Sequence, residues 1–122
     1  MRLWLAVAVF LALGCRADPA DDRLARTFLE RVRTRDPSGA ELLDPSGRVT
    51  WSSLSEMALY FPPGAPDAVN LVEREWATDK YGDFRKLTYR VERGRNVVLM
   101  EVWIVDVEGH RLVNSFQIRP PE

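Results

Sequence analysis

The chain has little of several residue types on which common kinds of protein chemistry depend. Its 122 residues include one cysteine and one histidine. A disulfide within the chain is therefore impossible, and stability in an oxidising compartment must come from packing alone. The sequence has no His-Glu-x-x-His motif and no pair of cysteines at ligand spacing. We therefore expect no metal site and no other cofactor.

An excess of charge of one sign is also missing. Seventeen basic and 18 acidic residues give a formal net charge of −1. The most basic stretch, residues 85–95, has the alternation of a strand with one solvated face. Nucleic-acid-binding domains usually carry a clear basic excess, so we expect no nucleic-acid partner.

Motifs of common enzyme classes are absent as well. The sequence has neither a glycine-rich phosphate loop nor a Gly-x-Ser-x-Gly nucleophile elbow. The single histidine, His110, falls in a predicted hairpin loop. A catalytic base needs a partner and a pocket, whereas a loop histidine is usually just solvated. We therefore assign no catalytic residue.

No apolar run is long enough for a membrane-spanning helix, which needs roughly 20 residues. The longest run covers residues 3–13 and follows the basic residue Arg2. A short apolar run behind a basic start is typical of a secretory signal peptide. Residues 1–14 are therefore predicted to be a signal peptide that is cleaved off.

The apolar run leads into LALGC, residues 11–15, which spans the predicted cleavage site. This pentapeptide resembles the lipobox of bacterial lipoproteins, in which aliphatic and small residues precede a cysteine. It differs from the commonest form, because Ala12 and Leu13 stand where that form has leucine and a small residue. The resemblance implies that the Cys15 thiol receives diacylglycerol, that the chain is cut before it, and that the new amine is acylated by a fatty acid such as palmitate.

Such a modification would anchor the protein to a membrane of the cell envelope. Each buried methylene contributes ~0.8 kcal/mol, so one acyl chain binds reversibly while two or three attach the protein permanently. The residue after Cys15 is Arg16. Many Gram-negative lipoproteins kept in the inner membrane have aspartate there, so the resemblance favours the outer membrane in a Gram-negative cell. A plain secretory signal, cleaved after Ala17, is the alternative.

The mature part begins with a lipidated tether, residues 15–21, followed by one small domain, residues 22–122. Asp18 and Pro19 suit the N-cap and first position of a helix, and apolar residues then recur at helical spacing. Pro37 should end this helix.

Two copies of Asp-Pro-Ser-Gly follow in residues 36–47 and predict turns. Their spacing does not fit a calcium loop. Residues 48–51 are predicted to form a short strand. Ser53 and Glu56 resemble a capping box that opens a second helix over residues 53–61, and residues 62–66 should be a loop.

From Ala68 onward the apolar period changes to two, which predicts four strands. A two-residue hairpin loop at 94–95 sets Tyr89 opposite Met100. A loop over residues 108–110, or an equivalent bulge, keeps Phe116 in phase with the previous strand. One face of the sheet is then strongly apolar: Leu87, Tyr89, Val91, Val98, Met100, Val102, Ile104, Leu112, Phe116 and Ile118.

The helices should cover that face. We therefore expect an α+β fold with helices on one face of a curved, mainly antiparallel sheet of about four to five strands. The order of elements over residues 19–119 resembles the NTF2-like superfamily, also called SnoaL-like or cystatin-like. The resemblance implies a cone that often encloses a pocket. Some members are isomerases or cyclases and many only bind ligands or form dimers, so the fold does not fix the function.

Polar residues on the apolar face mark a possible pocket. Tyr89, Asp106 and Asn114 are predicted to point toward the helices, and Tyr60 to approach from the second helix. In isomerase-like relatives an aspartate and a tyrosine move protons at such a place, which requires a dry pocket and a raised aspartate pKa. Alternatively, the tyrosine hydroxyl reaches the rim, Asn114 bonds to backbone, and Asp106 is exposed at the turn.

The opposite face carries a possible interface. Val97, Leu99, Trp103 and Val105 form an apolar ridge that Glu101 interrupts. An exposed apolar strip with tryptophan, and with arginine nearby, suits a protein partner or a second copy. Lysine and arginine stems lying over the ridge are the alternative.

The sequence therefore predicts a lipid-anchored envelope protein that binds a partner protein, a second copy or a small apolar ligand without catalysis. One alternative is a small isomerase, cyclase or hydrolase that uses a cavity at Tyr89, Asp106 and Asn114. A further alternative is a structural accessory of an envelope complex.

Overall fold

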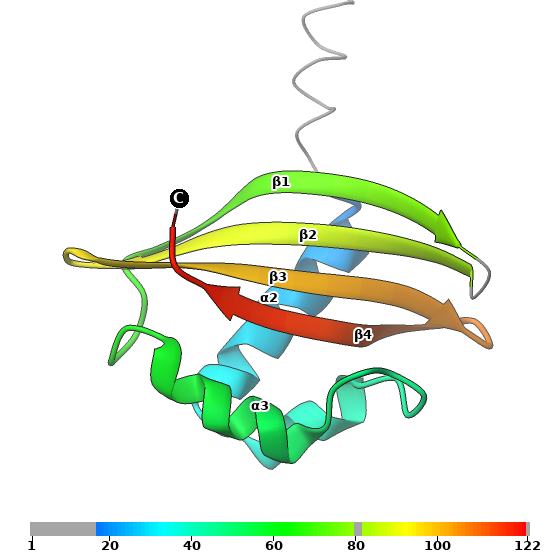
Figure 1. Cartoon of the computed structure of the whole chain (residues 1–122), viewed down its shortest axis with the longest axis horizontal. Coiled ribbons are helices and arrows are strands. Elements are labelled where there is room, and N and C mark those ends of the chain that lie inside the picture. The colour runs from blue at the N-terminus through cyan, green and yellow to red at the C-terminus, as the bar shows by residue number, and fades with distance from the viewer. Residues whose placement is uncertain (1–16, 80–81, 122) are drawn as a thin grey trace, which may run out of the picture.

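The structure, a computed structural model, describes residues 17–79 and 82–121. The predicted signal peptide, the lipobox and Cys15 lie outside the described residues. The described chain forms one four-stranded antiparallel sheet in the order β1-β2-β3-β4, with its helices on one face (Figure 1). This confirms the predicted α+β class, and the number of strands is four.

Helix α2 (Pro19–Arg33) begins as the sequence predicts. The Asp18 side chain accepts a hydrogen bond from the Ala20 backbone N–H at 2.8 Å and so caps the helix. Acidic residues in the first turn and arginines in the last suit the helix dipole. The helix ends before Pro37, as expected. Its buried apolar residues are Ala25, Phe28, Leu29 and Val32.

A short 3₁₀ helix, η1 (Pro37–Leu42), joins α2 to the next segment. Both predicted turns form through the same device, because Asp36 and Asp44 each accept from the backbone N–H of the serine two residues on, at 3.0 Å. Residues 43–48 then run along the edge of β4. The Asp44 N–H donates to the Val113 carbonyl at 2.9 Å, so this segment covers part of that edge.

The predicted strand at residues 48–51 is wrong. Thr50 is instead the N-cap of helix α3 (Trp51–Met57), since its hydroxyl accepts from the Ser53 N–H at 3.3 Å. The predicted Ser53 capping box is therefore wrong too, and the helix begins two residues earlier. The Thr50 cap explains the shift, and the ring of the first helical residue, Trp51, packs so closely on Gly39 that a Cβ there would lie 2.4 Å from it. A short η2 helix (Ala58–Tyr60) continues α3.

Strands β1 (Ala68–Asp79), β2 (Gly82–Arg93), β3 (Asn96–Val107) and β4 (His110–Arg119) form a meander. The β2–β3 hairpin has the predicted register, with Tyr89 opposite Met100 and a two-residue turn at 94–95. Gly94 adopts φ +58° there, a conformation that favours glycine.

The β3–β4 hairpin has the bulge that was predicted as an alternative, not the three-residue loop. Its turn is Glu108-Gly109, and the register shifts between Trp103 and Ile104. Phe116 therefore still lies opposite Val102. Beyond the bulge the faces of β4 exchange, because one extra residue reverses the alternation. Val113 is fully buried in place of Leu112, so the prediction that Leu112 belongs to the core is wrong.

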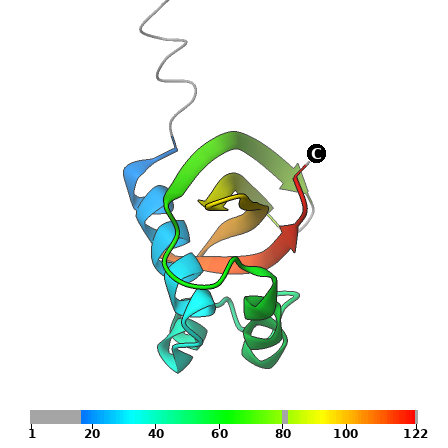
Figure 2. The same ribbon diagram turned by 90° about the vertical axis from the view of Figure 1, so that its left-hand side faces the viewer.

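The core lies between the inner face of the sheet and the helices α2 and α3. The Phe28 and Phe116 rings meet edge to face with centroids 5.3 Å apart. Seen from the end, the sheet is curved rather than flat, with α2 along one side and α3 below (Figure 2). Among the described residues, no helix is long and apolar enough to cross a membrane.

Candidate functional site

The four residues of the predicted pocket do not share one cavity. Tyr60 is 70% exposed at the end of η2. Tyr89 is fully buried under α2. Asp106 and Asn114 both line a hollow at the end of the sheet where the β3–β4 turn lies. The structure therefore brings Asp106 and Asn114 together and places the two tyrosines elsewhere.

Tyr89 fastens α2 to the sheet. Its hydroxyl donates to Asp22 Oδ1 at 2.6 Å, and the Arg26 guanidinium lies 5.2 Å from its ring centroid. Burial raises the pKa of Tyr89, and the hydrogen bond to Asp22 raises it further. A fully buried phenol that keeps its proton has no contact with a ligand and no proton to exchange at neutral pH.

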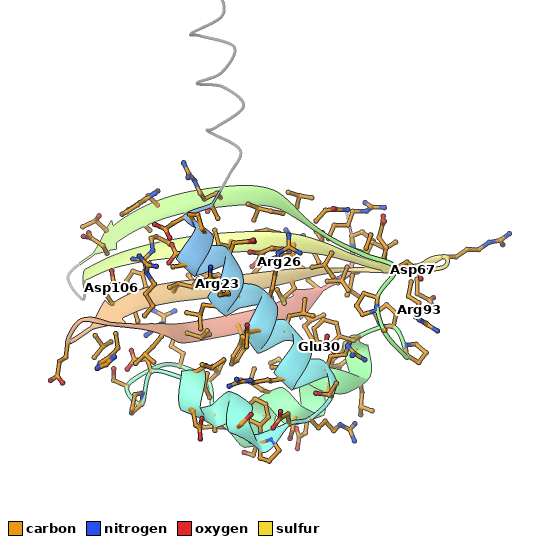
Figure 3. All side chains as sticks on the ribbon, turned by 180° about the vertical axis from the view of Figure 1, so that it is seen from behind. Arg23, Arg26, Glu30, Asp67, Arg93 and Asp106 are labelled. Carbon is orange, nitrogen blue, oxygen red and sulfur yellow. The ribbon has the colours of Figure 1, made fainter. Side chains whose placement is uncertain are left out.

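Asp106 belongs to an arginine-centred cluster that the sequence analysis missed. Arg85 Nε donates to Asp21 Oδ2 at 2.6 Å, and Arg85 Nη1 donates to Asp106 Oδ2 at 2.8 Å. Arg85 and Asp21 are buried, whereas the Asp106 side chain is 59% exposed. Figure 3 shows Asp106 at the end of the sheet nearest the start of α2, with Asp67 and Arg93 at the opposite end.

The cluster shifts the pKa of Arg85 and of Asp106. The hydrogen bond to Asp21 raises the pKa of Arg85, and the hydrogen bond from Arg85 lowers the pKa of Asp106. Asp106 is therefore a carboxylate at neutral pH. An aspartate that acts as a general acid, or as a general base near neutral pH, needs a raised pKa, which is the opposite of the shift at Asp106.

A signal for this cluster was present in the sequence. In the predicted alternation, Arg85 falls on the same face as Leu87 and Tyr89, which is the apolar face. A cation on such a face needs a buried anion. Asp21, in the first turn of the predicted helix, supplies this anion in the structure.

The hollow that contains Asp106 and Asn114 has a volume of about 530 Å³. Its apolar side comes from the outer face of β2 and β3, and residues 44–48 close it beside β4. Arg48 contributes an exposed cation. Its lining residues are Asp44, Ser46, Arg48, Asp83, Phe84, Val105, Asp106, Val107 and Asn114.

The buried carboxylate of this hollow is already held by the protein. Asp44 Oδ1 accepts from the Ser46 N–H at 3.0 Å and the Ser46 hydroxyl at 2.9 Å, and Oδ2 accepts from Asn114 Nδ2 at 3.1 Å. Burial alone would raise the pKa of Asp44, but these hydrogen bonds outweigh it and lower the pKa. Asp44 and Asn114 therefore shape the hollow and have little capacity for proton transfer.

The predicted ridge lies on the outer face, next to the hollow. Val97, Leu99 and Trp103 are half-buried, and Val105 is 8% exposed. The side of the sheet that faces the viewer in Figure 1 carries none of the described helices. The ridge and the hollow meet, because Trp103 and Phe84 line a second hollow of about 250 Å³ together with Arg48 and Asn114.

Charged side chains cover the middle of the ridge. Glu101, only 6% exposed, accepts from Arg119 Nε at 2.6 Å and lies 3.7 Å from Lys86 Nζ. Lys86 Nζ also lies 5.4 Å from the centroid of the Trp103 ring. The lysine and arginine cover that the sequence left open as an alternative therefore forms at this point.

No cluster of metal-ligating side chains is present in the described parts of the chain. Comparison with models of protein families, with curated proteins and with solved structures found no match. The site is therefore interpreted from its own geometry.

Proposed function

We propose that the protein is a bacterial lipoprotein of the cell envelope, anchored through Cys15, whose outer sheet face binds a partner protein without catalysis. The resemblance of residues 11–15 to a lipobox, directly behind a short apolar run, supports the anchor. Residue Arg16 supports an outer-membrane location in a Gram-negative cell. The binding role is supported by the outer face itself.

One observation carries the binding role: the outer face is free of described helices and combines an apolar ridge with a hollow. The ridge and hollow follow β3, a 12-residue strand, which spans about 40 Å at roughly 3.3 Å per residue. That length exceeds a small ligand and suits a protein segment. The ridge contains Trp103, and tryptophan is one of the residue types enriched at the centre of protein interfaces.

Protein binding is a better match to the geometry than the isomerase, cyclase or hydrolase alternative. Tyr89 is closed off by Asp22, and Asp106 stays ionised beside Arg85. A proton-transfer site needs groups that contact substrate and change charge near the working pH. The hollow supplies an apolar surface and fixed charges, which is typical of recognition.

We also propose an NTF2-like fold for the domain. Two features support it: the order of two helical segments followed by antiparallel strands, and the curvature of the sheet around α2 and α3 (Figure 2). The layout alone supports this assignment, and it carries no conclusion about activity.

The anchor is tested by the Cys15→Ser variant. We expect the wild-type protein to sediment with membranes and to show, by mass spectrometry, loss of residues 1–14 and a diacylglyceryl adduct on Cys15. The serine variant should lack the adduct and keep its signal peptide. A wild-type protein of unprocessed mass would refute the lipoprotein assignment.

The interface is tested by photo-crosslinking in native membranes. A photoreactive phenylalanine analogue placed at Leu99, on the ridge, should form a defined adduct that Trp103→Ala weakens. The same analogue at Leu59, which is 75% exposed on η2, is the control. An adduct of twice the chain mass identifies a second copy as the partner. Equal crosslinking from both positions would refute the ridge as the interface.

A further inference from the structure

Strand β1 carries two exposed apolar side chains, and one of them, Trp76, lies close to the start of helix α2. Val72 is 54% exposed and Trp76 is 65% exposed. Trp76 lines a hollow of about 190 Å³ together with Asp18, the N-cap of α2, and Arg111. Figure 1 shows the same arrangement, with the first turn of α2 reaching the side of the sheet where β1 is the edge. An exposed indole therefore lies where the folded domain begins.

The length of the tether determines what this surface faces. Asp18 follows Cys15 by three residues. Three residues span at most about 11 Å when fully extended. If Cys15 carries the lipid, as the proposed function states, the N-cap of α2 lies within that distance of the anchored residue. The surface around Asp18 must then lie against the headgroup layer of the bilayer.

The chemistry of this surface fits a phospholipid interface. Tryptophan concentrates at the level of the headgroups, where its apolar ring and its N–H group are both accommodated. The Arg85 guanidinium lies 6.0 Å from the Trp76 ring centroid, and the Arg111 side chain is 40% exposed beside it. Both guanidinium groups are paired with aspartates, Arg85 with Asp21 and Arg111 with Asp18 and Asp21, so the indole is the group that would enter the headgroup region.

We propose that the β1 edge is a membrane-docking surface, with the Trp76 indole in the headgroup region and the exposed Val72 farther along the same strand. This inference rests on the proposed lipid anchor and adds an orientation to it. The docked edge and the outer ridge are different surfaces, since Trp103 lies on β3 in the middle of the sheet. The domain would therefore present its ridge while it rests on the lipid.

The experiment uses tryptophan fluorescence of the lipidated protein in phosphatidylethanolamine and phosphatidylglycerol vesicles. The mature chain has three tryptophans, so the double variant Trp51→Phe, Trp103→Phe leaves Trp76 as the only emitter. The matched control, Trp51→Phe with Trp76→Phe, leaves Trp103. Circular dichroism checks that both variants fold, and mass spectrometry checks that both carry the lipid.

We expect brominated acyl chains to quench roughly half of the Trp76 emission and little of the Trp103 emission, because only Trp76 would reach the interface. The Trp76 emission should also lie at shorter wavelength in the lipidated protein on vesicles than in protein that lacks the lipid anchor and is dissolved in detergent-free buffer. Equal quenching of the two variants, or none of Trp76, in protein that mass spectrometry shows to be lipidated would overturn the docking surface. An unlipidated mass would instead overturn the anchor.

Discussion

Arg85 on β2 and Asp21 on the first turn of α2 form a buried two-point ion pair. The Nε–Oδ2 distance is 2.6 Å and the Nη2–Oδ1 distance is 3.0 Å. The two side chains are 9% and 3% exposed. This pair joins the first turn of α2 to β2.

The first prediction concerns this pair. Arg85→Met should lower the free energy of unfolding by about 3 kcal/mol, because the buried Asp21 carboxylate then keeps only the more exposed Arg111 as a counter-charge, 3.3 Å away. Urea denaturation measures the change. The double variant Arg85→Met, Asp21→Leu removes both charges and should be more stable than the single variant. A single variant as stable as wild type would show that the pair does not hold the helix.

The second prediction concerns pH. Hydrogen bonds lower the pKa of Asp44 below its ordinary value of 3.8 in the folded protein. Its contribution to stability is therefore present above that value and is lost as the pH falls through the lower, folded pKa. Unfolding in urea at about pH 6 and at about pH 3 measures this loss. Asp44→Asn should lose less stability than wild type over the same interval, and an identical loss would contradict the assignment.

The third prediction concerns the Tyr89 hydroxyl. Tyr89→Phe removes its hydrogen bond to Asp22 and should cost about 1–2 kcal/mol of unfolding free energy, since bonds to charged groups are among the stronger ones. Thermal or urea unfolding gives the value. Tyr60→Phe is the matched control, and it should change nothing measurable because Tyr60 is 70% exposed. Equal effects of the two changes would argue against a stabilising hydrogen bond between Tyr89 and Asp22.

The fourth prediction tests the bulge in β4. Val113 is fully buried, whereas Leu112 is only half-buried. Val113→Ala should therefore destabilise the protein by about 2 kcal/mol, and Leu112→Ala by less than about 1 kcal/mol. A regular alternation without the bulge gives the reverse order. The two unfolding curves thus distinguish the observed register from the simpler one.

Signals carried by neighbouring residues were sufficient for much of the fold. Asp18 and Pro19 marked the start of α2, because capping depends on a few adjacent residues. The alternation around Tyr89 determined the register of the β2–β3 hairpin, because a slip by one residue would turn all the apolar side chains of β2 to solvent. The four strands and the α+β class followed from the same alternation.

Features that depend on distant residues were not predictable in the same way. The start of α3 has its own cap at Thr50, but the packing of Trp51 on Gly39 joins residues that are far apart in the chain. The exact place of the bulge depends on how β4 meets both β3 and residues 43–48. The partners of Asp106 and Asn114 come from other elements, and this explains why the predicted four-residue pocket does not assemble.

The open edge of β1 has a consequence for how copies of the chain behave when they are crowded. Among the described strands, β1 pairs only with β2. The backbone N–H and C=O groups on its other side are therefore available for pairing with a strand of another molecule. A bulge between Leu71 and Glu73 and the charged run Glu73-Arg74-Glu75 interrupt that side. Bulges and charges of this kind disfavour pairing of one sheet edge with another. In the described part of the chain, the β1 edge therefore carries its own obstacle to edge-to-edge association between copies.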